Sequence, residues 1–129
     1  MPPIAVSLDR AEPAVGIVSL VGEHDAYSAH RLADELGLVM DSDAQVAVDL
    51  TDATFIDSQT LSALLTARNK AEERSLGFVL VLPPDDYTQV HRILDMTGLV
   101  GTFVTRPTLE DALAAARAHL ADPHRVEVG

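Results

Sequence analysis

Hydrophobic and polar positions change their spacing several times along the chain, and each change predicts a new element of secondary structure. Two stretches rich in β-branched residues, 4–9 (IAVSLD) and 14–21 (AVGIVSLV), flank a turn-like segment that contains Pro13. Strands separated by a short turn of this kind usually pair as a β-hairpin. The N-terminal segment therefore predicts two antiparallel strands.

The next segment has the spacing of a helix. Apolar residues recur three and four positions apart between residues 29 and 36, so that they share one helix face. We expect this helix to end near Gly37 or soon after. Either Ser28 or Asp25 is a suitable cap for its first turn.

A short strand and an amphipathic helix meet at residues 54–65, TFIDSQTLSALL. The run VAVDL at 46–50 predicts the strand, and helical spacing begins directly after the junction. We expect the helix to begin near Ser58 and to end before Gly77. Its charged residues, Arg68 among them, fall outside the apolar face and are expected on the surface.

Strand and helix then alternate to the end of the chain. The continuous apolar run FVLVL at 78–82 is typical of a strand buried on both faces. A helix that opens at Pro84 or Asp85 follows and closes at Gly98. The last elements are a short strand, TFVT, and a helix that begins with a capping-box-like Thr-x-x-Asp at 108–111.

The order of these elements predicts an α/β fold. A hairpin followed by a helix, and then by strand and helix in alternation, forms a mainly parallel sheet with an antiparallel edge hairpin and about four helices packed on it. The length of 129 residues suits one domain. We expect that domain at residues 1–122 and a C-terminal tail at 123–129.

Composition narrows the class of function. The chain has no cysteine, which excludes a disulfide framework, a thiolate metal site and a thiol nucleophile. Its 20 acidic and 9 basic residues give a net charge of -11, which disfavours binding to nucleic acid or to an anionic membrane. No leader pattern is present, and no apolar run approaches the ~20 residues of a membrane span. We expect a cytoplasmic protein whose partner is a protein or a cation.

The junction at Asp57 and Ser58 has two interpretations. Both residue types are favoured helix caps, because a side-chain oxygen accepts a hydrogen bond from a free N–H at the helix start. The alternative is that Ser58 is phosphorylated: the same N–H groups would hold the phosphate, which adds about -1.5 to -2 charge. Such a charge can abolish the docking of a protein partner.

Four segments then occur in an order that a known family shares. They are VGEHDAYSAHRL, VAVDLTDATFIDSQTLSALL, GFVLVLPP and VHRILDMTGL. They resemble, in turn, the Gly-Glu-x-Asp loop and helix, the Asp-Leu strand with the Asp-Ser-x-Gly-Leu site, the next strand, and the helix ending in Thr-Gly-Leu of a STAS domain of the anti-sigma factor antagonist type. With the final helix included, the resemblance spans nearly the whole chain.

The resemblance implies a function. Members of this bacterial family bind an anti-sigma factor and so free a sigma factor that regulates transcription. The partner is a serine kinase of the GHKL type that phosphorylates the serine matching Ser58, and a phosphatase reverses the modification. Only the unphosphorylated form binds, which makes the protein a partner-switching module. The family implies no cofactor, no metal and no catalytic activity in this chain.

The resemblance also implies where the partner binds. The expected contacts lie in the loop at 22–25 and at the start of the helix that follows residue 57. They comprise Gly22, Glu23, Asp25, Asp57, Ser58, Gln59 and Thr60. Asp49, which matches the Asp-Leu pair at the end of its strand, is expected to support the site.

Two residues depart from the family pattern. Thr60 stands where the family usually has glycine, so we expect its branched side chain to hinder the kinase or to change which kinase is accepted. Its hydroxyl is also a second group near the helix start that a kinase could phosphorylate. His24 stands where the family usually has an apolar residue. A single histidine in an acidic loop is typical of a solvated side chain, and the alternative is titration near neutral pH.

Other classes of protein fit the sequence less well. A serine hydrolase would need the flanking glycines of a nucleophile elbow, and a metal hydrolase a histidine pair at helical spacing. A phospho-receiver domain would need an acidic pair after the first strand, where only Asp9 is found, and a lysine near the last strand. One alternative keeps the STAS fold: an unphosphorylated scaffold or regulatory subunit of a stress-signalling or lipid-transport complex.

Overall fold

The computed structural model describes residues 3–84 and 88–124. Its elements, in chain order, are β1 (Ile4–Asp9), β2 (Val15–His24), α1 (Ala26–Asp41), β3 (Gln45–Ile56), α2 (Ser58–Glu73), β4 (Phe78–Val81), α3 (Gln89–Met96), β5 (Val104–Arg106) and α4 (Leu109–Arg117). The strands form one sheet in the order β1-β2-β3-β4-β5. β1 is antiparallel to β2, and the remaining neighbours are parallel. The predicted α/β fold with an N-terminal edge hairpin and four helices is confirmed.

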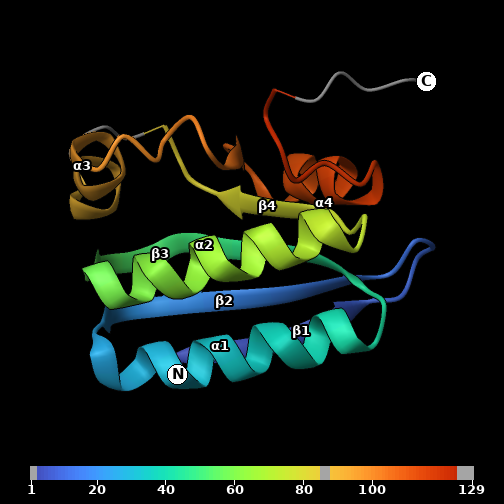
Figure 1. Ribbon diagram of the computed structural model, residues 1–129, viewed down its shortest axis with the longest axis horizontal. Helices are drawn as coiled ribbons and strands as arrows, with labels where there is room; N and C mark the ends of the chain where they lie inside the picture. The colour runs from blue at the N-terminus through green and yellow to red at the C-terminus, as the bar shows by residue number, and fades with distance from the viewer. Residues whose placement is uncertain (1–2, 85–87, 125–129) are drawn as a thin grey trace.

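Helices cover both faces of this sheet. Figure 1 shows α1 and α2 side by side across one face, and α3 belongs to the same layer of the core. α4 packs on the opposite face. Side chains alternate along a strand, so Val46 and Val48 of β3 join the first layer while Ala47 joins the second. The apolar run that forms β4 is buried throughout, as its sequence predicts.

Two strands run further than their apolar pattern indicates. β3 continues past the predicted end at Leu50 to Ile56, and β2 continues past Val21 to His24. The two strands pair along this extension, where Glu23 faces Phe55 and His24 faces Ile56. β4 pairs with β3 only from Val46 to Asp49, so the extension of β3 has β2 as its strand neighbour. Exposed polar residues such as Thr51 and Asp52 conceal this extension in the sequence.

Helix boundaries agree with the sequence predictions for α1 and differ for α3. α1 is capped by Asp25, one of the two predicted caps, and ends at Asp41, four residues after Gly37. α3 begins at Gln89 behind a Thr88 cap, so the predicted start at Pro84 is wrong, and Asp85 lies outside the described residues. The predicted stop at Gly98 holds, because this residue has a φ of +71° just after the C-cap, a conformation that favours glycine.

Arg68 of α2 corrects one prediction of surface exposure. Its side chain is buried, with only 9% of the residue exposed. The Nε atom donates to the carbonyl oxygen of Ala121 at 2.9 Å, and Nη1 lies 2.9 Å from a carboxylate oxygen of Glu72. Nη2 lies 3.7 Å from a carboxylate oxygen of Asp122. This arginine therefore joins α2 to the segment that follows α4.

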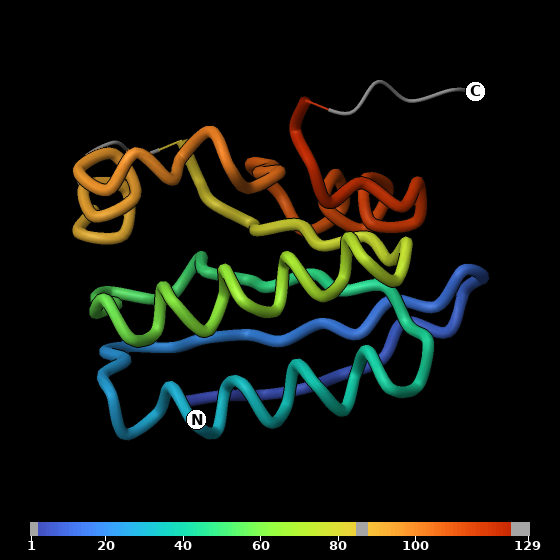
Figure 2. The backbone as a smooth tube through the Cα atoms, in the orientation of Figure 1, coloured from blue at the N-terminus to red at the C-terminus, as the bar shows by residue number. Residues whose placement is uncertain are grey.

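Parallel strand order places the two candidate segments at one end of the molecule. The turn from β2 into α1 and the turn from β3 into α2 lie at the same end, at the left of Figure 2. The backbone N–H of Asp57 donates to the carbonyl of His24 at 3.1 Å, so these turns are in direct contact. The carboxyl ends of parallel strands are where α/β proteins usually carry their sites.

Candidate functional site

Asp57, and not Ser58, caps α2. The Asp57 side chain accepts a hydrogen bond from the backbone N–H of Thr60 at 2.8 Å. Ser58 is the first residue of the helix and is exposed to solvent. Because Asp57 satisfies the helix start, the Ser58 hydroxyl is not needed as a cap. Of the two interpretations of this junction, the capping role falls to Asp57 alone, and the phosphorylation of Ser58 stays a prediction.

The predicted loop at 22–25 is not a loop: residues 22–24 are the end of β2, Asp25 is the cap of α1, and this segment lies against the start of α2. Gly22 has a φ of +78°, and the register of β2 against β3 shifts between Gly22 and Glu23, so the strand is irregular at this point. Glu23 and Asp25 are both exposed. Asp25 caps α1 by accepting from the backbone N–H of Tyr27 at 3.0 Å and of Ser28 at 3.4 Å. The predicted residues of both segments therefore adjoin in the fold.

His24 is not a solvated side chain. Its exposed fraction is 0%, which contradicts the expectation for a histidine in an acidic loop. The reason is the strand extension: His24 is still part of β2 and pairs with the buried Ile56, so its ring faces the core. The ring nitrogens lie near the hydroxyl of Ser28 and the carbonyl of Val21, at 3.2 and 3.1 Å.

Thr60 is also buried, with 0% of the residue exposed. Its hydroxyl donates to the carbonyls of His24 at 3.3 Å and Asp25 at 3.4 Å. Thr60, the third residue of α2, faces the sheet, so its hydroxyl is not an exposed second phosphate acceptor beside Ser58. These hydrogen bonds of Thr60 join the start of α2 to the end of β2. Its expected effect on a kinase stays a prediction.

Asp49 lies apart from the contact between residues 22–25 and the start of α2, and Gln59 lies at its edge. Asp49 is half-buried inside β3, not at a strand end, and accepts from the backbone N–H of Thr51 at 2.9 Å. Its support of the site stays a prediction. Gln59 is exposed in the first turn of α2, next to Ser58.

Gln89 is a residue that the sequence did not indicate. It comes from α3, and its side-chain oxygen accepts from the backbone N–H of Ile56 at 2.8 Å. Its side-chain nitrogen donates to the Ile56 carbonyl, also at 2.8 Å. The Gln89 side-chain amide thus binds both backbone groups of Ile56 on the side of β3 that β4 does not reach. A polar residue 33 positions away carries no local signal of this contact.

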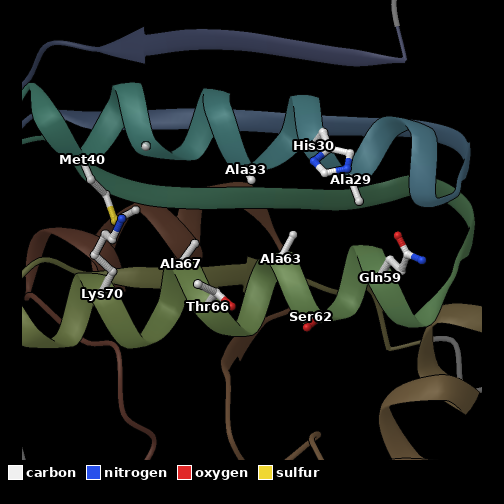
Figure 3. A pocket seen from close by; sticks show the side chains of 11 residues that line it. Ala29, His30, Ala33, Met40, Gln59, Ser62, Ala63, Thr66, Ala67 and Lys70 are labelled. Atoms are coloured by element: carbon white, nitrogen blue, oxygen red, sulfur yellow. The ribbon is translucent and has the colours of Figure 1, made fainter.

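A groove of about 380 Å³ runs between α1 and α2 from this end of the molecule (Figure 3). Small side chains of both helices border it, including Ala29, Ala33 and Ala63. Gln59 lines the end nearest the candidate site, and Lys70 lies at the other end beside Met40. The groove therefore opens directly beside the first turn of α2.

The described part of the chain contains neither a metal cluster nor a membrane span. Within residues 3–84 and 88–124, no group of three or more His, Asp or Glu side chains is arranged to hold a metal ion. In the same residues, no helix is long and apolar enough to cross a membrane.

Comparison with known proteins decides the family. The model of the STAS domain matches residues 8–112, which include both candidate segments. The chain is a STAS domain protein. A search of the curated proteins found no match to this STAS protein.

Solved structures support the same assignment. An anti-sigma factor antagonist from Mycobacterium paratuberculosis is 31% identical to this STAS protein, with a TM-score of 0.72 over 88% of this chain and 94% of that chain. The Bacillus cell fate determinant SpoIIAA in its phosphorylated form is 17% identical, with a TM-score of 0.60 over 85% and 97%. SpoIIAA, an anti-sigma factor antagonist, in its unphosphorylated form is 15% identical, with a TM-score of 0.62 over 85% and 94%. The two SpoIIAA structures show a shared fold.

Proposed function

We propose that this STAS protein is an anti-sigma factor antagonist that is switched off by phosphorylation of Ser58. The observation that carries the proposal is the arrangement at the start of α2: Asp57 caps the helix, and Ser58 is left exposed beside residues 22–25, where β2 ends and α1 begins. The likeness to the Mycobacterium paratuberculosis antagonist supports the family role. That SpoIIAA exists in phosphorylated and unphosphorylated forms supports the modification.

The switch is electrostatic. The unphosphorylated protein docks through Ser58 and Gln59 of α2 and through Glu23 and Asp25, which are exposed where β2 ends and α1 begins. A phosphate on Ser58 adds about -1.5 to -2 charge to a surface that already carries these carboxylates and Asp57. A partner surface without a matching cation is then repelled, and the complex dissociates.

The chain acts here as a binding partner and a substrate, and the kinase belongs to the other protein. The partner is an anti-sigma factor of the GHKL serine kinase type, and a phosphatase restores the binding form. Release of the sigma factor then regulates transcription in the bacterial cytoplasm. The buried Thr60 side chain contacts the carbonyls of His24 and Asp25, so its effect on a kinase acts through the position of residues 22–25, while the kinase itself meets the exposed Ser58 and Gln59.

Phosphorylation by candidate kinases tests the proposal. The purified protein is incubated with GHKL-type anti-sigma kinases and ATP, and the phosphate is located by peptide mass spectrometry. We expect phosphate on Ser58, its loss in Ser58→Ala, and its retention in Ser62→Ala, which removes an exposed serine one turn further along α2. Phosphorylation should also weaken binding of the kinase.

Two outcomes would change the conclusion. Tight kinase binding without any phosphate would indicate a constitutive antagonist. Neither binding nor phosphate, with kinases that modify a control substrate, would favour the scaffold or regulatory subunit instead.

A further inference from the structure

The groove between α1 and α2 is long and narrow. Gln59 borders one end and Lys70 the other, three turns apart on α2, which corresponds to about 16 Å of helix. A volume of about 380 Å³ over this length leaves a mean width of about 5.5 Å. A helix with its side chains is about 10–12 Å across and cannot enter such a space. A single extended hydrocarbon chain, about 5 Å across, fits it.

Gly37 keeps the groove open near its Lys70 end. This residue lies inside α1, where glycine is less stable than alanine. A Cβ at Gly37 would meet no heavy atom within 4 Å, whereas a Cβ at Gly16 would lie 2.4 Å from Val39. Packing therefore explains Gly16 but not Gly37. An open groove does explain Gly37, because any side chain at this position would occupy the empty space.

The charge of the groove differs from that of the chain as a whole. The chain has 20 acidic residues, but none of the described residues that line the groove is acidic, and Lys70 is the only lysine or arginine among them. Lys70 takes part in none of the ion pairs in the part of the chain that the structure describes. The carboxylate next to the groove residue Met40, that of Asp41, lies 3.3 Å from Arg74 instead. An unpaired ammonium at one end of an apolar groove favours a ligand with an anionic head.

We propose that this groove binds a free fatty acid, with the carboxylate at Lys70 and the hydrocarbon chain between the two helices. Ala33 of α1 and Ala63 of α2 form apolar walls along the path toward Gln59 (Figure 3). A chain of about twelve carbons spans the groove, because each extended C–C bond advances the chain by about 1.3 Å. This site does not depend on the phosphorylation of Ser58.

Binding of dodecanoate to the full chain tests the head and the location of the ligand. The ¹H–¹⁵N spectrum is followed by nuclear magnetic resonance during a titration below the concentration at which micelles form. We expect saturable binding, with shifts concentrated at groove residues such as Ala33 and Ala63. Lys70→Gln should weaken this binding about three- to fivefold, the effect of one exposed ion pair. Arg92→Gln removes the same charge from an exposed position on α3 and should bind as the wild type does.

Gly37→Leu tests the hydrocarbon part of the site. Its side chain fills the groove and should weaken dodecanoate binding at least tenfold, while the urea midpoint of unfolding should not fall, because leucine favours a helix more than glycine does. Gly37→Ala adds one methyl group and should have a smaller effect on binding. Thr54→Leu places the same side chain at an exposed position of β3 outside the groove, so its affinity should match that of the wild type.

Several results would overturn the proposal. The absence of binding would do so, and so would an unchanged affinity in Gly37→Leu. Shifts that do not saturate, or that spread over exposed apolar side chains such as Tyr27 and Met96, would indicate a detergent-like association instead. Equal affinities of Lys70→Gln and Arg92→Gln would refute the position of the carboxylate.

One consequence rests on the proposed function. Gln59 belongs both to the groove and to the predicted docking surface beside Ser58. Dodecanoate should therefore slow the phosphorylation of Ser58 in the wild type but not in Gly37→Leu, and an unchanged rate would refute this coupling. If no kinase phosphorylates Ser58, the proposed function fails, while the dodecanoate titration still decides the binding site.

Discussion

At the scale of single residues, the neighbours Asp57 and Ser58 divide two roles that one serine would otherwise combine. A serine that caps a helix directs its oxygen at the backbone and is poorly placed for another protein. Because the Thr60 N–H donates to Asp57, the exposed Ser58 at the first position of α2 is not needed as a cap. The capping role and the presentation of the hydroxyl can therefore be tested separately.

Substitution of Asp57 tests its capping role. Asp57→Ala removes the acceptor for the Thr60 N–H and should lower the free energy of unfolding by about 1 kcal/mol. Asp57→Asn keeps a cap oxygen and should stay close to the wild type. Urea denaturation of the three proteins measures the difference, and equal losses in both variants would show that the carboxylate charge, not the hydrogen bond, stabilises the helix start.

The residues of the site were only partly predictable from the sequence. The choice of Ser58, Glu23 and Asp25 as site residues comes from the resemblance to the family, and all three are exposed. The burial of His24 and Thr60 does not follow from the sequence, because it depends on the pairing of β2 with β3 beyond their apolar runs. Whether a polar side chain is solvated is decided by chain segments that are distant in the sequence.

At the scale of elements, single polar side chains hydrogen-bond the backbone at or near the ends of helices and strands. Gln89 of α3 binds both backbone groups of Ile56, and Arg68 of α2 binds the carbonyl of Ala121 after α4. In each case a side chain forms a hydrogen bond with a backbone group that has no such bond to a neighbouring strand or helix. The helices and strands can be predicted from apolar periodicity. These hydrogen bonds cannot, because nothing in the local sequence distinguishes Gln89 and Arg68 from ordinary surface residues.

Removal of the Gln89 side chain should loosen the end of β3. Gln89→Ala leaves the Ile56 N–H and carbonyl without their partner, which should cost about 1–3 kcal/mol of unfolding free energy. The Ile56 amide should also exchange its hydrogen faster. Hydrogen exchange followed by mass spectrometry checks this, and unchanged exchange in the peptide around Ile56 would contradict it.

Arg68 should matter more for stability than a surface arginine on the same helix. Arg68→Ala leaves the Ala121 carbonyl unpaired and should lower the free energy of unfolding by about 1.5–3 kcal/mol. The matched control is Arg74→Ala, since Arg74 is exposed and forms a 3.3 Å ion pair with Asp41, a type of pair worth about 0–1 kcal/mol. Chemical denaturation of both variants provides the comparison, and equal losses would refute the role of Arg68.

At the scale of the whole molecule, the chain carries a strong excess of acidic side chains, and one of them joins the hairpin to the last helix. Asp9 of β1 lies 2.9 Å from Nη2 of Arg117 in α4. The backbone N–H of Ala11 and the guanidinium of Arg117 lower the pKa of Asp9 below its ordinary value. A group whose pKa is lowered by folding stabilises the fold above its unfolded pKa, and this contribution disappears as the pH falls.

Acid titration of stability tests this contact. The unfolded pKa of an aspartate is about 3.9, so wild-type protein should lose the Asp9 contribution as the pH falls below this value and through the lower folded pKa. Asp9→Asn has no such proton to gain. Its free energy of unfolding should therefore fall less than that of the wild type between neutral pH and about pH 3. Parallel stability curves for the two proteins would rule this linkage out.

The strand order determines where this molecule can change. β4 supports β3 only as far as Asp49, so the strand continues to the docking end with β2 as its strand neighbour. Residues 22–25 and 57–60 therefore lie beyond the part of the sheet that has four or more strands side by side. Substitutions of the exposed residues at this end, such as Glu23 and Gln59, can accumulate without disturbing the packed centre of the domain. A lineage of such proteins can thus acquire new partners by changing these exposed residues while it inherits the same packed sheet.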